Sequence, residues 1–145
     1  MTAKEQRIIE LARSWLGTPY HHRASTRGAG CDCIGLIRGL WRDLYGREPP
    51  EIGPYTGEWA EATGSEALLA AARQHLVEKP IAAATPGDVL IFRLRHNSVA
   101  KHAGILVAAD RMIHAQEGVP VSDVHLGPWW RRHIAGVFAL PDLGA

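Results

Sequence analysis

The chain turns from a polar loop into a helix at residues 30–36, which read Gly30-Cys31-Asp32-Cys33-Ile34-Gly35-Leu36. Apolar residues then recur at helical spacing as far as Leu44, and Gly46 is placed to end the helix. Asp32 occupies the N-cap position, where a carboxylate accepts hydrogen bonds from backbone N–H groups. Cys33 therefore falls in the first turn of the predicted helix, where a thiol is expected to have a lowered pKa and a nucleophilic thiolate form.

The rest of the chain divides into a helical half and a β-rich half. Residues 3–16 carry apolar side chains at helical spacing, and Gly17 ends this run. Thr63 and Glu66 have the spacing of a capping box, which predicts a third helix. The second half contains short β-type runs separated by turns, at residues 89–92, 103–108, 112–116, 119–124 and 134–140. Helices followed by an antiparallel sheet indicate an α+β fold.

Composition predicts a single domain spanning residues 1–145. The chain is 46% apolar and 21% charged, as in globular proteins. Its formal charge of +1 gives no general field that would attract nucleic acid, and we expect no such partner. No run approaches the ~20 apolar residues that span a bilayer, so no membrane insertion is expected. The polar start, residues 1–7, lacks the features of a secretory signal, which predicts synthesis in the cytoplasm without a signal peptide.

A nucleophilic cysteine needs a histidine nearby, and two histidines lie on predicted strands. His102 precedes the run 103–107, where it would reach the start of a helix packed on the sheet. His114 lies on the next strand and would orient the imidazole of His102, as the third member of a catalytic triad does. The two side chains share one sheet face only if the turn near Asp110 has an odd residue count or a strand contains a bulge.

Several motifs occur together in an order that resembles the NlpC/P60 family of cell wall peptidases, across nearly the whole chain. They are Pro19-Tyr20, residues 30–36, Pro86-Gly87-Asp88, Lys101-His102-Ala103-Gly104-Ile105 and Ile113-His114-Ala115. The resemblance implies a papain-like fold, with N-terminal helices packed on an antiparallel sheet. It implies that Cys33 is the nucleophile, His102 the base and His114 the residue that orients the base. It also places Tyr20 beside the nucleophile, where it would help to hold the oxyanion, and implies no cofactor and no metal.

The form Gly-Cys-Asp-Cys and the segment Trp129-Trp130-Arg131-Arg132 resemble the family branch encoded by tailed phages and gene transfer agents. This implies a thiol protease that hydrolyses peptidoglycan stem peptides, commonly between D-glutamate and diaminopimelate. The enzyme would be a virion component that binds phage-like tail or baseplate proteins and acts on the cell wall in the periplasm during DNA delivery. The alternative is a structural tail-tip subunit with the same fold and little or no activity. Acyl transfer to an acceptor other than water would use the same thioester.

Three features depart from the family pattern. Ile34 stands where many members have serine, and Cys31 is an additional thiol. Residues 47–80 form a longer loop-plus-helix insert, which could be a lid, a substrate wall or a docking surface. A zinc site built from Cys31, Cys33 and His21-His22 is disfavoured, because structural zinc sites place roughly two to four residues between paired cysteines. We interpret Cys31 as a buried or loop thiol.

Two residue types allow more than one interpretation. A single cysteine on a helix is more often a small buried hydrophobe than a nucleophile, and only the joint occurrence with His102 and His114 favours catalysis. Trp129 and Trp130 could grip a glycan or a neighbouring subunit. The favoured interpretation is that they cover the end of the sheet.

Overall fold

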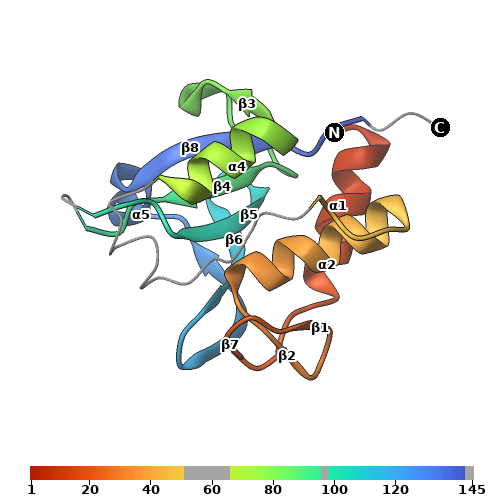
Figure 1. Ribbon diagram of the computed structural model, residues 1–145. Helices are drawn as coiled ribbons and strands as arrows, with labels where there is room; N and C mark the ends of the chain where they lie inside the picture. Colours follow the sequence, from red (N-terminus) through yellow and green to blue (C-terminus); the bar gives the residue numbers. More distant parts are fainter. Residues whose placement is uncertain (51–65, 96–97, 143–145) are drawn as a thin grey trace.

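The computed structural model describes residues 1–50, 66–95 and 98–142. Helices α1 (Ala3–Arg13) and α2 (Cys33–Tyr45) pack beside a six-stranded antiparallel sheet (Figure 1). Lys4 of α1 forms an ion pair with Asp142 at 2.8 Å. The sheet has the strand order β3-β8-β4-β5-β6-β7. Its strands are β3 (Val77–Lys79), β4 (Val89–Phe92), β5 (His102–Ala108), β6 (Arg111–Gln116), β7 (Val119–His125) and β8 (Ile134–Ala139). The predicted α+β fold is confirmed.

Smaller elements connect these parts. A hairpin of β1 (Ser25–Thr26) and β2 (Gly30–Cys31) precedes α2, and α4 (Ala67–His75) lies over the sheet near β8 and β4 (Figure 1). A 3-10 helix, η1 (Ile81–Ala83), leads into β4, and the short helix α5 (Pro128–Arg132) follows β7. Strand β3, the hairpin and α5 are each too short to display a period, so the sequence does not predict them.

Caps define the two long helices. Thr2 caps α1 in a capping box with Glu5, and the helix ends at Arg13, before the predicted limit. Leu16, the last residue of the predicted run 3–16, lies beyond the helix with 42% of its surface exposed, so the run does not extend that far. A Cβ at position 39 of α2 would lie 2.0 Å from the ring of Trp15, so α1 and α2 approach as closely as they do because residue 39 is glycine. The predicted N-cap and C-cap of α2 are both confirmed.

The predicted start of the third helix needs correction. Helix α4 begins at Ala67, three residues after the start that a capping box from Thr63 would give, and its N-cap Glu66 makes no capping hydrogen bond. The Glu66 carboxylate instead accepts hydrogen bonds from Arg93 Nη2 at 2.7 Å and from the Ala100 backbone N–H at 3.0 Å. Thr63, like Tyr55 and Trp59 of the insert, lies outside the described residues. Tertiary contacts of Glu66 thus replace the local cap.

The sheet separates two apolar cores. Ile91, Ile105 and Ile113 point into the larger core, which α1, α2 and α4 cover. Residues of opposite parity, including Leu106 and Met112, point into a smaller core with Trp130 of α5 against it. Each strand residue therefore points toward one core or the other according to its position, because side chains alternate between the two faces of a sheet.

Both predicted histidines lie on the face of the smaller core. Gly104 pairs with His114 and Leu106 pairs with Met112, and the register shifts between Leu106 and Ala108. His102, two residues before Gly104, therefore shares a face with His114. The strand irregularity that the sequence analysis required is present.

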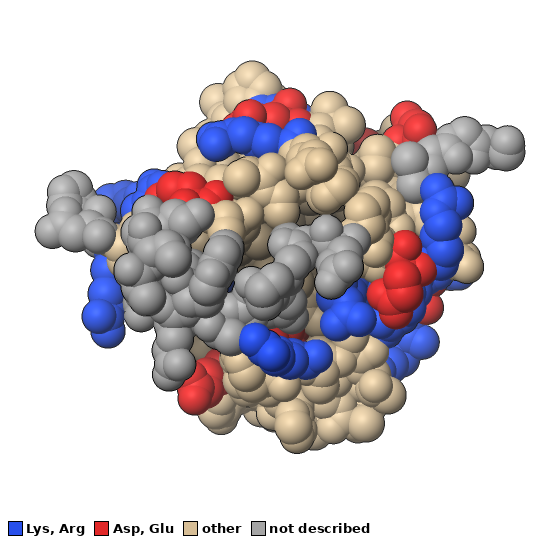
Figure 2. All heavy atoms as spheres, viewed as in Figure 1, with Lys and Arg blue, Asp and Glu red and all other residues tan. Residues whose placement is uncertain are grey.

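Charged side chains of both signs are interspersed on the face shown in Figure 2, in keeping with the formal charge of +1. Several form exposed ion pairs, such as Arg42 with Glu48 at 3.1 Å and Arg73 with Glu78 at 3.2 Å. Among the described residues, no helix is long and apolar enough to cross a membrane.

Candidate active site

Cys33 is positioned by the first turn of α2, at the start of the interior strand β5. Its Sγ lies 3.8 Å from the carbonyl oxygen of Lys101 and also accepts a hydrogen bond from the backbone N–H of Ala103. The side chain is partly buried. The thiol thus contacts the backbone on both sides of His102, and the fold brings together two residues that are 69 positions apart in the sequence.

His102 and His114 form a direct pair. The Nε2 atom of His102 lies 2.8 Å from Nδ1 of His114, and the two side chains are 7% and 3% exposed. In the described register a Cβ on Gly104 would come within 3.2 Å of the His114 Cβ, so glycine leaves room for this ring on the shared face. The structure therefore pairs the rings of His102 and His114 and places the Cys33 thiol against the backbone that flanks His102.

The surroundings of these groups favour their neutral forms. Burial, and after it the charge of Asp32, raises the pKa of the Cys33 thiol to about 12, against hydrogen bonds from Ala103 and Ile34 that lower it. Burial and the charge of His114 lower the pKa of His102 to about 3, and burial lowers the pKa of His114 to about 4. The expected low thiol pKa is wrong for the resting protein, because desolvation outweighs the favourable helix start.

Asp32 connects the loop before α2 to the helix. One carboxylate oxygen accepts a hydrogen bond from the Gly35 N–H at 2.7 Å, and the other accepts one from the Arg23 N–H at 2.7 Å. Arg23 has a φ of +65°, a conformation that non-glycine residues rarely adopt. The buried carboxylate therefore caps α2 and holds an unfavourable turn beside the nucleophile.

Tyr20 lies next to the same site. It forms an isolated bridge with Cys31, whose backbone N–H donates to Pro19 O and whose carbonyl accepts from His21 N–H, both at 3.0 Å. Burial, then the charges of Asp32 and Cys33, raise the pKa of the Tyr20 hydroxyl to about 12. These contacts place the backbone of Tyr20 against Cys31, two residues before Cys33, and the hydroxyl of Tyr20 stays protonated as a hydrogen-bond donor.

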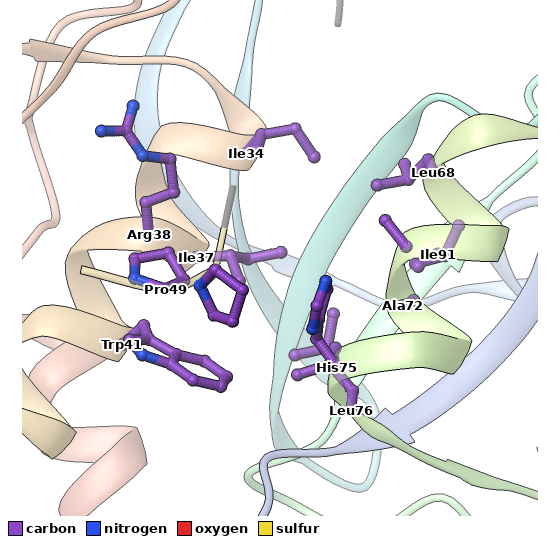
Figure 3. Close-up of a pocket in the computed structure, with 13 residues that line it drawn as sticks. Ile34, Ile37, Arg38, Trp41, Pro49, Leu68, Ala72, His75, Leu76 and Ile91 are labelled. Carbon is purple, nitrogen blue, oxygen red and sulfur yellow. The ribbon is translucent and has the colours of Figure 1, made fainter. Parts of the chain in front are cut away.

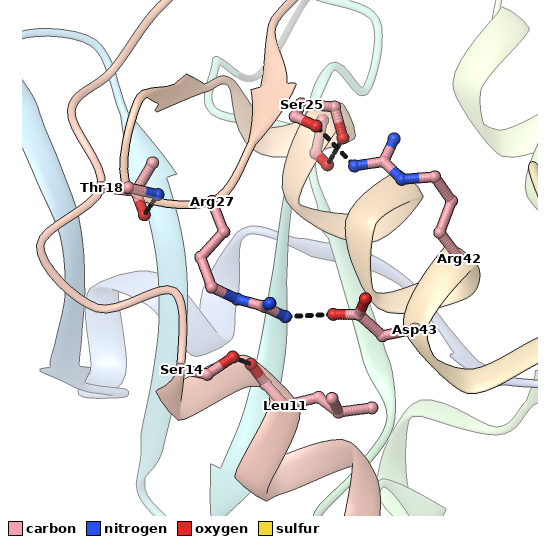
Figure 4. A network of polar contacts seen from close by, with 9 residues as sticks. Leu11, Ser14, Thr18, Ser25, Arg27, Arg42 and Asp43 are labelled. Carbon is pink, nitrogen blue, oxygen red and sulfur yellow. Dashed lines mark hydrogen bonds and ion pairs between the residues drawn. The ribbon is translucent and has the colours of Figure 1, made fainter. Parts of the chain in front are cut away.

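A set of polar contacts fastens the hairpin loop to the helices (Figure 4). Arg27 pairs with Asp43, and Arg42 donates to the carbonyl of Ser25. The hydroxyl of Ser25 in turn donates to the carbonyl of Gly35 at 2.6 Å. These bonds hold the loop along α2, from Gly35 in its first turn to Arg42 and Asp43 in its last turn.

Cys31 is fully buried in the larger core, which agrees with its interpretation as a structural thiol. Burial, followed by the charge of Asp32, raises its pKa to about 11. Within the parts of the chain that the structure describes, no group of three or more His, Cys, Asp or Glu side chains is placed to hold a metal ion.

An apolar groove lies between α2 and α4, with Ile34 at one end and Trp41 and Leu76 near the other (Figure 3). It has about 520 Å³ of empty space, including the part open to solvent, and its polar side chains are Arg38 and His75. The groove starts one residue after the thiol but contains neither His102 nor His114, which lie on the other face of the sheet. It therefore supplies no reacting group.

Sequence reasoning missed one prominent contact of the site. The indole ring of Trp130 lies with its centroid 5.8 Å from that of His102 and 5.2 Å from that of His114. Phe92 completes this cluster at 5.2 Å from Trp130. Covering the sheet was the favoured interpretation of the tryptophans, but nothing in the sequence indicated that Trp130 would cover the histidines.

Relatives with annotated activities share sequence with most of this chain. Gamma-DL-glutamyl hydrolase of Bacillus subtilis is 26% identical over 137 residues, covering 94% of this chain and 29% of that protein. Murein DD-endopeptidase MepS/Murein LD-carboxypeptidase of Escherichia coli is 25% identical over 130 residues, covering 88% of this chain and 58% of that protein. The chain thus spans well under two thirds of the length of either relative.

Solved structures share the fold. The NlpC/p60 domain of the peptidoglycan hydrolase SagA superposes with a TM-score of 0.67 at 20% identity, covering 94% of this chain and 98% of that domain. The peptidoglycan hydrolase RipB of Mycobacterium tuberculosis gives a TM-score of 0.63 at 16% identity, covering 94% of this chain and 64% of that one. The sequence profile of the NlpC/P60 family matches residues 17–138, which include the thiol and both histidines. The chain is therefore a member of the NlpC/P60 family.

Proposed function

We propose that this protein is a cysteine endopeptidase that hydrolyses peptidoglycan stem peptides. The observation that carries the proposal is the contact of the Cys33 thiol with the backbone on both sides of His102, whose imidazole is hydrogen-bonded to His114. A thiol, a base and a group that orients the base form the minimal set for acyl transfer to a cysteine.

The first half of the reaction begins from neutral groups. His102 takes the proton of Cys33 as the sulfur attacks the carbonyl carbon, because the thiol pKa of about 12 leaves almost no thiolate beforehand. The mechanism requires the tautomer in which Nε2 of His102 donates to Nδ1 of His114, 2.8 Å away, so that Nδ1 of His102 is the nitrogen that accepts the proton. Backbone N–H groups at the start of α2 and the Tyr20 hydroxyl stabilise the oxyanion.

The second half returns the enzyme to its resting state. The imidazolium of His102 gives its proton to the departing amine, and a thioester between Cys33 and the acyl group is left. His102 then removes a proton from a water molecule, which attacks the thioester and releases a carboxylic acid and the free thiol. His114 keeps the ring of His102 in one tautomer throughout.

The substrate class is taken from relatives. Two are named for hydrolysis of gamma-DL-glutamyl and murein bonds, although those names describe different linkages. We place the cut between D-glutamate and diaminopimelate, which is the linkage common in the family and agrees with a gamma-glutamyl specificity.

We further propose that the enzyme travels on a phage-like tail and opens peptidoglycan locally during DNA delivery. The support is the resemblance of Gly30–Cys33 and residues 129–132 to the phage and gene transfer agent branch. Purified particles should contain the protein at a fixed number of copies, measured by quantitative mass spectrometry. Protein that is abundant in lysate but absent from particles would refute delivery and leave the peptidase proposal intact.

The enzymatic proposal is tested with defined muropeptides under reducing conditions, with products identified by mass. Wild-type protein should cut the stem peptide, while Cys33→Ala should leave it intact and fold normally. A folded wild-type protein that cuts no stem peptide would favour the structural tail-tip subunit. Undiminished cutting by Cys33→Ala would disprove the nucleophile assignment and make Cys31 the next thiol to test.

A further inference from the structure

Helix α5 places Trp130 directly on the histidine pair. The indole is tilted by 30° to the ring of His102 and is nearly perpendicular, at 87°, to the ring of His114. Trp130 is half-buried, whereas both histidines are buried. One part of the indole therefore meets solvent and another part meets the two imidazoles, so the ring separates their hydrogen bond from bulk water.

The indole is held firmly in this place. Its ring centroid lies 5.2 Å from that of Phe92, which is fully buried. The neighbouring Arg131 anchors α5 by donating to the carbonyls of Leu126 at 3.1 Å and Ala109 at 2.6 Å. A ring fixed by aromatic packing on one side and by an anchored helix on the other restricts where the imidazoles can move.

We propose that Trp130 is a positioning residue that holds the His102–His114 hydrogen bond in its dry, productive geometry. The proposal deepens, and rests on, the peptidase activity proposed above. It assigns a function to one residue of the Trp-Trp-Arg-Arg segment, which the reaction itself does not use.

The surroundings of the pair make this proposal testable by pH. The charged or titratable groups around it include Cys33 on α2, Asp32 and Tyr20 before α2, and Lys101 next to His102. On the side of α5 they are Arg131, Arg132 and the C-cap residue His133. Arg131 is engaged with backbone carbonyls, and the ring of His133 stacks on Trp129 at 4.1 Å. Burial is the leading cause of the low pKa of both imidazoles, ahead of the charge of His114 on His102. Removing the indole should therefore raise both pKa values.

The experiment compares Trp130→Ala, Trp130→Phe and the matched control Trp129→Ala, which removes the exposed tryptophan of the same helix. Imidazole pKa values are measured by NMR titration, with the Cys33→Ala protein as background so that the thiol does not contribute. The pKa values of His102 and His114 should rise toward about 6.5 in Trp130→Ala, stay low in Trp130→Phe and be unchanged in Trp129→Ala.

Kinetics on muropeptides give the second readout. In Trp130→Ala, kcat should fall on the order of tenfold to a hundredfold with little change in KM, and Trp130→Phe should restore most of the activity. Unchanged or lower imidazole pKa values in Trp130→Ala, or a raised KM with kcat intact, would overturn the proposal. If Trp130→Ala does not fold, the test rests on Trp130→Phe. Low imidazole pKa values together with a near-normal kcat in Trp130→Phe support the proposal, and raised pKa values or a low kcat refute it. The titration gives its answer even if the wild-type protein cuts no peptide, so the two proposals fail independently.

Discussion

Asp32 offers a test that separates electrostatics from structure at the nucleophile. Replacing Asp32 with alanine removes the N-cap of α2, which costs about 1 kcal/mol of stability. It also leaves the Arg23 N–H without its charged acceptor, which costs about 1–3 kcal/mol. Asp32→Ala should therefore lower the free energy of unfolding by about 2–4 kcal/mol. Asp32→Asn keeps one acceptor oxygen, so it should lose about half as much.

The pKa of the Cys33 thiol should respond to these substitutions differently from the free energy of unfolding. The charge of Asp32 raises the pKa of Cys33, second only to burial. Both substitutions remove this charge, so both should lower the thiol pKa by a similar amount, although burial keeps it above the value of about 8.5 for a free cysteine. Two variants with unequal stability and equal thiol pKa are the expected result.

Urea unfolding measures the first quantity, and the pH dependence of iodoacetamide alkylation, resolved at Cys33 by mass spectrometry, measures the second. Buried Cys31 reports on any general opening of the fold. Ser25→Ala is the matched control, because it removes the 2.6 Å bond from the same loop to Gly35 without changing charge. Alkylation profiles that follow the loss of stability, or that also shift in Ser25→Ala, would refute the electrostatic explanation.

Two further predictions concern acid and the insert. The unfolded chain protonates His102 and His114 below pH of about 6.5, whereas their folded pKa values are about 3 and 4. Stability is therefore complete above pH ~6.5 and falls as the pH is lowered, by roughly 2 kcal/mol per imidazole at pH 5. Urea unfolding between pH 7 and pH 5 should show that His114→Asn loses about half as much stability as the wild-type protein. Equal losses would contradict the low pKa of His114. Glu66→Ala removes the carboxylate that binds the backbone just before β5, so hydrogen exchange of the Ala100 amide should speed up and kcat should fall. Glu66→Gln, which keeps an acceptor oxygen, should restore slow exchange, and unchanged exchange in Glu66→Ala would count against a role for the insert at the site.

Local patterns predicted the elements that carry a clear period or cap. Asp32 and Gly46 delimit α2 as expected, and the five predicted strands occur within one or two residues of their predicted limits. The third helix was less well predicted, since Glu66 serves a tertiary contact with Arg93 and Ala100 in place of a local cap. Local preference decides a helix end only where no long-range partner competes for the same side chain.

The candidate site was predicted by the order of motifs more than by the chemistry of single residues. Spacing could not place His102 and His114 on one face, because that depends on the irregularity between Leu106 and Ala108. Neither could it predict the thiol pKa, which depends on burial by parts of the chain far from Cys33. The contact of Trp130 with the two histidines could not be predicted either, since the five residues of α5 show no period.

The contact of the Cys33 thiol with the backbone beside His102 depends on where β6 stops pairing with β5. Gly104 pairs with His114, so a regular ladder would pair Ala103 with Ala115. The Ala103 N–H would then donate a hydrogen bond to the carbonyl of Ala115. The Sγ of Cys33 takes that N–H instead, and β6 changes register with β7 just after His114. The helix that carries the nucleophile lies on one side of the sheet and the histidines point to the other, so the thiol reaches the backbone of His102 at the start of β5, where the pairing with β6 ends. An interrupted ladder at His114 is therefore a structural requirement of the site, and it explains why the group that orients His102 is the last residue of β6 to keep the β5 register.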